Sequence, residues 1–248
     1  MIDYAIQPNG DMIKLYNYCK LKNVEFFWID HHITAIENIG VDTIPGLVDD
    51  TVCGSFNTWL FMMEQEKKIG TAPKILKMVN DLDTWNRKNT KFSWNDEILP
   101  ITYYINSLGF ELNDNNSELV QFLKNSFNDS YDMTNELKIG NRILNYVKTL
   151  ERQNLKKIYQ IEWNGYNCLV LNTTLIGSMQ FEQHPDFNNV DLCITWSYDG
   201  KYYYYGMYST KLNIDVGDLC QTFLNGGGHK SAGGGQTKEF ILKCKNFI

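Results

Sequence analysis

The chain has 248 residues, enough for one large domain or two modest ones, and its formal net charge at pH 7 is −6. This acidic balance argues against broad, sequence-independent binding to duplex nucleic acid, which needs a basic face, but it allows a local basic pocket for one or two phosphates. No apolar run approaches the roughly 18 residues needed to span a bilayer, so we expect no membrane association.

Helix-like and strand-like segments alternate in the first half of the chain. Residues 11–22 and 55–68 predict amphipathic helices, whereas 26–29, rich in aromatic and β-branched residues, predicts a buried strand. Residues 75–79 are interpreted as a further strand. Such alternation is typical of an α/β protein with a mostly parallel, doubly wound sheet and crossover helices.

The pattern changes in the second half. Residues 134–157 predict one long helix with a polar face, which we interpret as an interdomain connector. The strands expected after it are 159–163, 168–172, 192–196 and 202–207, the last two joined as a hairpin by Asp199-Gly200. We therefore expect a first domain over residues 1–133, a connector helix over 134–158 and a smaller α/β domain over 159–248.

Six scattered cysteines show no paired or metal-binding spacing, and no signal peptide precedes them. Free thiols in a reducing, cytoplasmic environment are therefore expected.

Acidic and imidazole side chains recur where the expected strands of the first half end. Asp3 follows Met1-Ile2, Asp30-His31-His32 closes the strand over 26–29, and Asp81 and Asp83 follow 75–79. Parallel strands deliver such residues to one edge of a sheet, where carboxylates and an imidazole form an oxygen/nitrogen set that suits Mn²⁺. The alternative is structural, because aspartate at a strand end is commonly a helix N-cap and the histidines fit a polar loop.

A glycine-rich stretch, NGGGHKSAGGG, covers residues 225–235. Gly226, Gly227 and Gly228 allow backbone N–H groups to approach an anion closely, and His229 and Lys230 add donors and charge. The sequence therefore predicts a phosphate-binding loop, with a flexible linker as the alternative.

Together, and in this order, the two signals resemble the DHH/DHHA1 phosphoesterase family, which includes oligoribonucleases and pAp phosphatases. The DHH triplet is literal at 30–32, and the terminal glycine-histidine motif is GGGHKSAGG. The segment NDLDTW at 80–85 is similar to the family's fourth motif, and LNTTLIGS at 171–178 is similar to the start of its second domain. The resemblance covers essentially the whole chain. It implies a DHH domain, a DHHA1 domain and hydrolysis of phosphoester bonds by water activated by two Mn²⁺ ions.

The resemblance also implies roles for individual residues. Asp3 would bridge both ions, His31 would ligate one of them, and Asp81 would complete that ion's ligands, with Asp83 as the alternative. Asp30 would orient His31, and His32 would face the scissile phosphate as a hydrogen-bond donor or general acid. In the second domain, the substrate's terminal phosphate or base would be held by Gly226, Gly227, Gly228, His229 and Lys230.

One departure from the family is large. Its first motif, a histidine and two aspartates, has no counterpart, because only Met1 and Ile2 precede Asp3. We expect a chain that is incomplete at its N-terminus, or a homo-oligomer or partner that supplies the missing segment. Short oligoribonucleotides, pAp or cyclic dinucleotides are the expected substrates. The alternative is a catalytically impaired relative that binds nucleotides without cleaving them.

Overall fold

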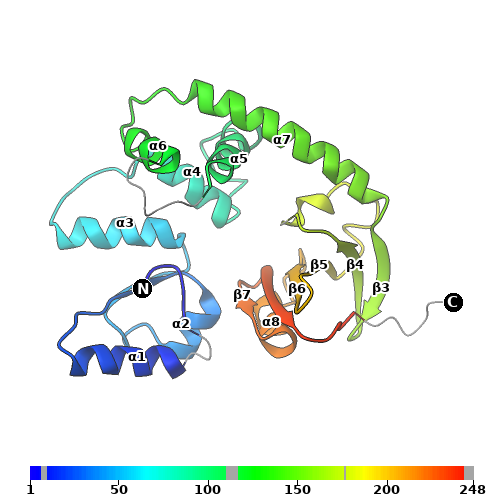
Figure 1. Ribbon diagram of the computed structural model, residues 1–248, viewed down its shortest axis with the longest axis horizontal. Helices are drawn as coiled ribbons and strands as arrows, with labels where there is room; N and C mark the ends of the chain where they lie inside the picture. The colour runs from blue at the N-terminus through cyan, green and yellow to red at the C-terminus, as the bar shows by residue number, and fades with distance from the viewer. Residues whose placement is uncertain (7–9, 110–116, 176, 243–248) are drawn as a thin grey trace. The chain divides into compact units, whose positions relative to one another are not determined.

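A computed structural model of the chain describes residues 1–6, 10–109, 117–175 and 177–242 (Figure 1). The chain divides into two compact units, Met1–Val147 and Lys148–Ile248. None of the described helices is long and apolar enough to cross a membrane.

The first unit contains two short strands and a larger number of helices. In chain order, its elements are α1 (Gly10–Leu21), β1 (Trp28–Asp30), α2 (Ile33–Ile39), β2 (Gly46–Val48), α3 (Gly54–Gln65), α4 (Lys74–Asp83), a π-helical turn (Trp94–Ile98), α5 (Leu99–Ser107), α6 (Glu118–Ser126) and the first part of α7 (Thr134–Leu155).

The sheet of the first unit is parallel. Strand β1 pairs with β2, with Ile29 opposite Leu47. On the other side of β1, Ile2 forms a parallel bridge with Ile29. The Asp3 amide donates to the Ile29 carbonyl at 2.8 Å, and the Ile29 amide donates to the Met1 carbonyl at 2.9 Å. The first three residues therefore form a further parallel row, which brings Asp3 to the carboxyl end of β1.

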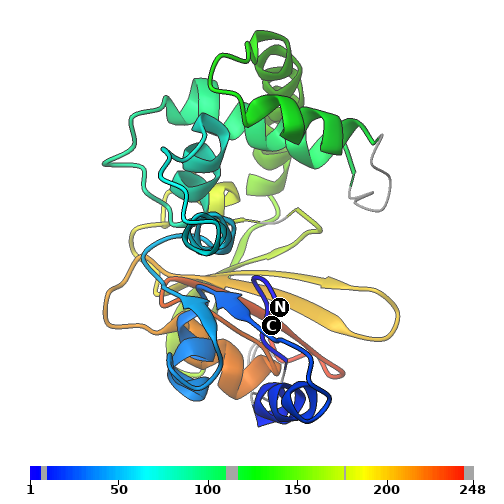
Figure 2. The same cartoon turned by 90° about the vertical axis from the view of Figure 1, so that its left-hand side faces the viewer.

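Helices cover both faces of this sheet, and they confirm the predicted α/β class. Fully buried Trp28 packs with Met12 of α1 and Ile39 of α2 on one face. On the other face, the Phe27 ring lies 5.2 Å from the ring of Phe61 in α3. Figure 1 and the rotated view in Figure 2 show α1 and α3 on opposite sides of the strands.

Residues 75–79 are not a strand, as the sequence analysis expected, but part of helix α4. The buried side chains Ile75 and Met78 are three residues apart, and Leu82 follows four residues later, so they share one helical face. A short apolar run cannot distinguish a strand from a buried helix, and here the 3.6-residue period decides. This face packs against α5 and α6 through Ile101 and Phe122.

The second unit is built on a six-stranded mixed sheet. After the end of α7, its elements are β3 (Tyr159–Trp163), β4 (Tyr166–Asn172), a 3-10 turn (Ser178–Gln180), β5 (Leu192–Tyr198), β6 (Tyr203–Tyr208), α8 (Val216–Leu224), β7 (Gly227–Gly228) and β8 (Ala232–Thr237). The strand order is β3-β4-β5-β6-β8-β7, and only β4 and β5 run parallel. The predicted strands and the β5–β6 hairpin are confirmed.

Helix α8 and a loop segment cover the two faces of this sheet. Fully buried Val216, Cys220 and Leu224 of α8 pack on Ile194 and Met207 of the central strands. On the other face, Leu169, Leu171 and Cys193 pack against Phe181 and Val190.

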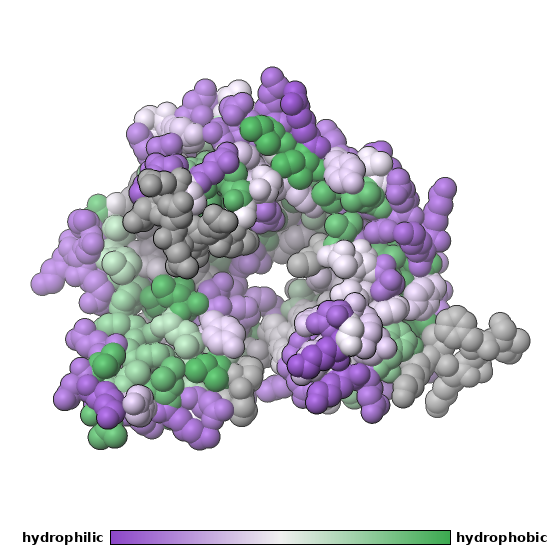
Figure 3. All heavy atoms as spheres, viewed as in Figure 1, coloured by the Kyte–Doolittle hydropathy of each residue, from purple (hydrophilic) through white to green (hydrophobic). Residues whose placement is uncertain are grey.

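The long helix predicted over 134–157 is present as α7, and the division between the two units falls within it. The surface view in Figure 3 shows hydrophobic residues gathered on the part of this face that lies between α1 and α3, with hydrophilic residues around them. The five described cysteines are free thiols, as expected, and Cys244 lies outside the described residues.

Candidate active site

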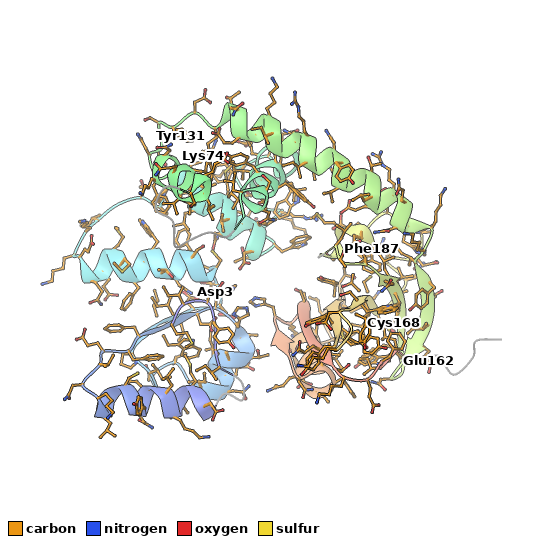
Figure 4. The ribbon with its side chains drawn as sticks, in the orientation of Figure 1. Asp3, Lys74, Tyr131, Glu162, Cys168 and Phe187 are labelled. Carbon is orange, nitrogen blue, oxygen red and sulfur yellow. The ribbon has the colours of Figure 1, made fainter. Side chains whose placement is uncertain are left out.

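A buried imidazole lies between two carboxylates at the carboxyl end of β1. His31 Nε2 is 3.2 Å from Asp3 Oδ1, and His31 Nδ1 is 3.4 Å from Asp83 Oδ2. The His31 side chain is 5% exposed, whereas those of Asp3 and Asp83 are 51% and 45% exposed. The three groups come from the row over residues 1–3, the end of β1 and the last turn of α4, and Figure 4 labels Asp3 near the strands. We call Asp3, His31 and Asp83 the carboxylate–imidazole cluster.

Asp30 lies beside this cluster and accepts several hydrogen bonds. Its Oδ1 accepts from the backbone amides of His31 at 2.7 Å and His32 at 3.1 Å, and lies 2.7 Å from His32 Nδ1. Its Oδ2 accepts from Trp28 Nε1 at 3.1 Å. Burial by itself raises the pKa of Asp30, but the hydrogen bonds from His32 and His31 outweigh it and hold the pKa below its usual value. Asp30 is therefore a buried carboxylate that stays ionised.

This geometry corrects one expectation of the sequence analysis. Asp30 was expected to orient the His31 ring, but its carboxylate contacts the His32 ring and reaches His31 through the backbone amide. The hydrogen bond to Asp30 raises the pKa of His32, against the opposing effect of burial. The raised pKa favours the protonated form of His32, in which Nδ1 donates to Asp30.

Asp81 and Asp83 have different surroundings, which spacing alone could not show. Both oxygens of the buried Asp81 carboxylate accept hydrogen bonds, from Asn86 Nδ2 at 2.8 Å and from Thr90 Oγ1 at 2.5 Å. Asp81 thereby anchors the loop that follows α4. Asp83, the alternative candidate, is the one that reaches His31. The structure therefore places Asp83, rather than Asp81, in the cluster.

Asp3 occupies an unusual backbone conformation next to a glycine. Its φ is +54°, in the left-handed region that is uncommon for residues other than glycine. A Cβ atom built on Gly54, the first residue of α3, would lie 2.3 Å from Asp3 Oδ1 and 2.6 Å from its Cγ. The hydrogen bond with His31 lowers the pKa of Asp3. Gly54 therefore leaves the space in which an ionised Asp3 carboxylate meets His31.

Asn57 is a second residue that the sequence analysis did not identify. It is fully buried in α3, and its Nδ2 donates to the Asp49 carbonyl at 2.8 Å and to the Asp30 carbonyl at 3.1 Å. These carbonyls lie at the ends of the two parallel strands, so Asn57 ties both strand ends to α3. An asparagine inside an apolar helix face, three residues after Gly54, was the available signal.

The donor atoms of this region fit a divalent cation. Asp3, Asp30 and His32 each place one candidate ligand atom within 4.8 Å of the others. Asp83 adds a second partly exposed carboxylate on the other side of His31. Carboxylate oxygens combined with imidazole nitrogen suit Mn²⁺ better than a metal that prefers sulfur ligands. Asp30 Oδ1 already accepts from the amides of His31 and His32, so Asp3 and His31 are the more available ligands, whereas Asp83 faces the other ring nitrogen of His31.

The predicted phosphate loop of the second unit is a tight hairpin between β7 and β8. Gly227 pairs with Gly234 and Gly228 with Gly233. The turn is closed by His229 and Ala232, whose amides donate to each other's carbonyls at 2.7 Å and 3.3 Å. His229 is half-buried and Lys230 is exposed at this turn. The residues predicted to bind substrate, Gly226, Gly227, Gly228, His229 and Lys230, are thus gathered on one short segment.

Close packing explains several glycines of this hairpin. A Cβ atom on Gly226 would lie 1.9 Å from the Gly234 carbonyl oxygen, and one on Gly235 would lie 2.6 Å from Leu224 Cβ. The Gly226 amide donates to the Cys220 carbonyl at 3.2 Å and closes the end of α8. The expectation that this amide is free for an anion is therefore wrong. Phosphate binding by the rest of the hairpin stays a prediction.

Comparison with known proteins rests on the fold. No protein-family model matches the sequence, and no curated protein matches it. Among solved structures, the chain is similar to the DHH domain of a member of the s1p family of ribosomal proteins, with a TM-score of 0.54 and 14% sequence identity. That alignment covers 90% of this chain and 62% of the other.

Two further similarities have lower TM-scores. A pGpG-specific phosphodiesterase from Vibrio cholerae matches with a TM-score of 0.45 and 14% identity over 87% of this chain and 76% of that one. An exopolyphosphatase-related protein from Bacteroides fragilis matches with a TM-score of 0.42 and 13% identity over 97% and 66%. With the parallel sheet, the long helix and the mixed second sheet in place, the chain has the fold of the DHH-domain proteins, as the resemblance predicted.

Proposed function

We propose that the protein is a Mn²⁺-dependent phosphoesterase that hydrolyses phosphodiester or phosphomonoester bonds in short oligoribonucleotides or small nucleotides such as pAp and cyclic dinucleotides. The observation that carries the proposal is the His31 imidazole held between the Asp3 and Asp83 carboxylates, with His32 Nδ1 in contact with Asp30 beside it. The DHH fold and the order of the two sequence motifs support the same reaction class.

Asp3 and the Nε2 atom of His31 would hold the metal ion, and Asp83 would orient the imidazole through Nδ1. Their donors are oxygen and nitrogen atoms, and both carboxylates are partly exposed while the imidazole is fixed by burial. A bound Mn²⁺ ion would polarise a phosphoryl oxygen and lower the pKa of a water molecule. Gly54 and Asn57 would hold the ligands in position, because Gly54 leaves space for the Asp3 carboxylate and Asn57 fixes the end of β1.

His32 is proposed as the proton donor. Its raised pKa keeps the imidazole protonated to a higher pH than usual, and the contact of its Nδ1 with Asp30 fixes the ring orientation. With Nδ1 directed at Asp30, the proton available for transfer to a leaving oxygen is the one on Nε2. The second unit would hold the substrate's terminal phosphate or base at Gly227, Gly228, His229 and Lys230.

The alternative function is nucleotide binding without cleavage. It is favoured by one observation: Asp3 and Asp83 face different nitrogens of His31, so the two carboxylates and the imidazole do not converge on one position. For catalysis, a homo-oligomer or a partner chain is proposed as a source of further metal ligands. We propose a cytoplasmic location for either function.

The test measures Mn²⁺ binding and hydrolysis of pApA and pAp by the purified chain and four variants. His31→Ala is expected to abolish measurable Mn²⁺ binding. Asp83→Asn should weaken it at least about 10-fold, whereas Asp81→Asn, the matched control, should lower stability more than metal affinity. His229→Ala should weaken nucleotide binding and leave Mn²⁺ binding intact.

The outcomes separate the two functions. Nucleotide binding without turnover at any Mn²⁺ concentration would favour the binding protein. Unchanged metal titration in the His31→Ala and Asp83→Asn variants would remove both residues from the site and overturn the proposed metal centre.

A further inference from the structure

Helix α4 ends in a motif that normally requires glycine, and this chain has tryptophan there. The Asn86 amide donates to the Asp81 carbonyl at 2.8 Å, and the Trp85 amide donates to the Leu82 carbonyl at 3.1 Å. This pair of hydrogen bonds defines a Schellman motif. The C-cap of α4 is Thr84, and the motif requires a left-handed conformation at the residue that follows the C-cap. Trp85 adopts this conformation, with a φ of +56°. For a bulky residue this is a genuine outlier, and such strain is concentrated at functional sites.

The Trp85 side chain is held firmly and yet remains accessible. The Arg87 guanidinium carbon lies 4.2 Å from the centre of the Trp85 ring and 4.9 Å from that of Trp94. The two indole rings are 5.3 Å apart in an edge-on arrangement, with an interplanar angle of 78°. Trp85 is nevertheless 44% exposed. A tryptophan whose only role was to fill the core would be buried, so core packing does not account for the strained backbone.

The local charge differs from that of the whole chain. Residues 85–91 (WNRKNTK) contain Arg87, Lys88 and Lys91 and no acidic residue, in a chain whose net charge is −6. Asp83 of the carboxylate–imidazole cluster is only two residues before Trp85, so their Cα atoms are at most about 7 Å apart. An exposed indole and its neighbouring cations therefore follow Asp83 directly in the chain. This combination suits a nucleotide, whose base stacks on an aromatic ring and whose phosphates attract cations.

We propose that Trp85, supported by Arg87, is a stacking surface for a base of the substrate. This inference rests on the proposed function and deepens it, because it restricts the substrate to molecules that carry a nucleobase. Inorganic polyphosphate offers phosphates but no ring, so Trp85 would contribute nothing to its binding. This role would account for a strained, exposed tryptophan directly after the helix that carries Asp83.

The experiment compares a probe with bases and a probe without them. The first probe is a 5′-phosphorylated dinucleotide that contains 2-aminopurine, whose fluorescence is quenched when it stacks on an indole. The second is inorganic tripolyphosphate, with binding measured by calorimetry. Trp85→Leu is expected to abolish most of the quenching and weaken dinucleotide binding at least about 5-fold, with tripolyphosphate binding unchanged. Trp85→Phe should retain part of the dinucleotide affinity, because a smaller ring remains.

The matched control is Phe127→Leu. Phe127 also lies at a helix end, as the C-cap of α6, and is 51% exposed, but its φ of −73° is unstrained. Its replacement should change neither binding constant. A Trp85→Gly variant tests folding separately, because glycine fits the left-handed conformation, and it should unfold at no lower temperature than Trp85→Leu.

Equal losses for both probes in Trp85→Leu, or no loss for the dinucleotide, would overturn the stacking role. These results differ from a failure of the phosphoesterase proposal. If the chain never hydrolyses pApA but dinucleotide binding still depends on Trp85, stacking stands and catalysis falls. If hydrolysis persists in Trp85→Leu with unchanged KM, catalysis stands and stacking falls.

Discussion

Replacing Gly54 by alanine tests the proposed metal site with the smallest addition of atoms that the chain allows. The new Cβ would lie 2.3 Å from Asp3 Oδ1, 2.6 Å from its Cγ and 2.9 Å from its Cβ, whereas ordinary contacts begin at 3.4 Å. The Asp3 carboxylate must therefore retreat by 3.4 − 2.3 = 1.1 Å or turn away from α3. Because the Asp3 side chain is 51% exposed, it can move without disturbing a core.

A displacement of this size is large for a metal ligand. Distances from ligand to metal hold within about 0.2 Å in well-formed sites, so Asp3 would leave coordination range. We expect Mn²⁺ affinity to fall at least about 10-fold, the lower end of the loss seen when a ligand's support is removed. Stability should not fall in parallel, because alanine is favoured over glycine by about 0.5–1 kcal/mol within a helix.

The assay is calorimetric titration of Mn²⁺ into wild type, Gly54→Ala and Gly10→Ala, with urea unfolding of the metal-free proteins alongside. Gly10 is the matched control, because it also begins a helix and an added Cβ would meet nothing within 4 Å. Gly10→Ala should bind Mn²⁺ like wild type. If Gly54→Ala retained full affinity with an intact fold, Asp3 would not be a ligand, and the reasoning from its contact with His31 would fail.

Three further predictions concern stability and are checked by urea unfolding of the metal-free protein. The free energy of unfolding should decline as pH falls below about 4, because the lowered pKa of Asp30 stabilises the fold only while the carboxylate is ionised. It should also decline as pH rises above about 6.5, because the raised pKa of His32 stabilises the fold only while the imidazole is protonated. His32→Gln should lack the decline at higher pH. Asn57→Leu should cost about 1–3 kcal/mol, because the partly buried Asp49 carbonyl loses its side-chain donor, and a neutral result would show that water replaces the amide. Gly226→Ala should destabilise the second unit severely, because its Cβ would overlap the Gly234 carbonyl oxygen at 1.9 Å, and wild-type stability would mean that the hairpin can open without cost.

Much of the fold could be predicted because its signals are local. The helices over 11–22, 55–68 and 134–157 and the strands of the second unit follow from the spacing of apolar residues, and the structure contains them with small shifts at their ends. Residues 75–79 were misassigned because so short a segment, with four apolar residues among its five, is compatible with a strand. The helical period becomes clear only when Leu82 is included and the packing of this face on α5 and α6 is seen.

The site was predicted in part for the same reason. Parallel pairing of residues 1–3 with β1 could be anticipated, and it brings Asp3 to His31. The choice between Asp81 and Asp83 depends on where Asn86 and Thr90 return in the loop after α4, which sequence spacing does not encode. The need for glycine at position 54 likewise could not be predicted, because it depends on the contact with the Asp3 carboxylate, which lies far away in the sequence.

The spacing of two residues at the start of α3 is fixed by their contacts with the proposed active site. Gly54 leaves space for the Asp3 carboxylate, and three residues later Asn57 donates hydrogen bonds to the carbonyls at both strand ends. Since each added residue rotates a helix by about 100°, an insertion between them would turn one contact away from the sheet whenever the other was kept. Loops beyond the far end of α3 can vary in length, but the three-residue interval from Gly54 to Asn57 cannot.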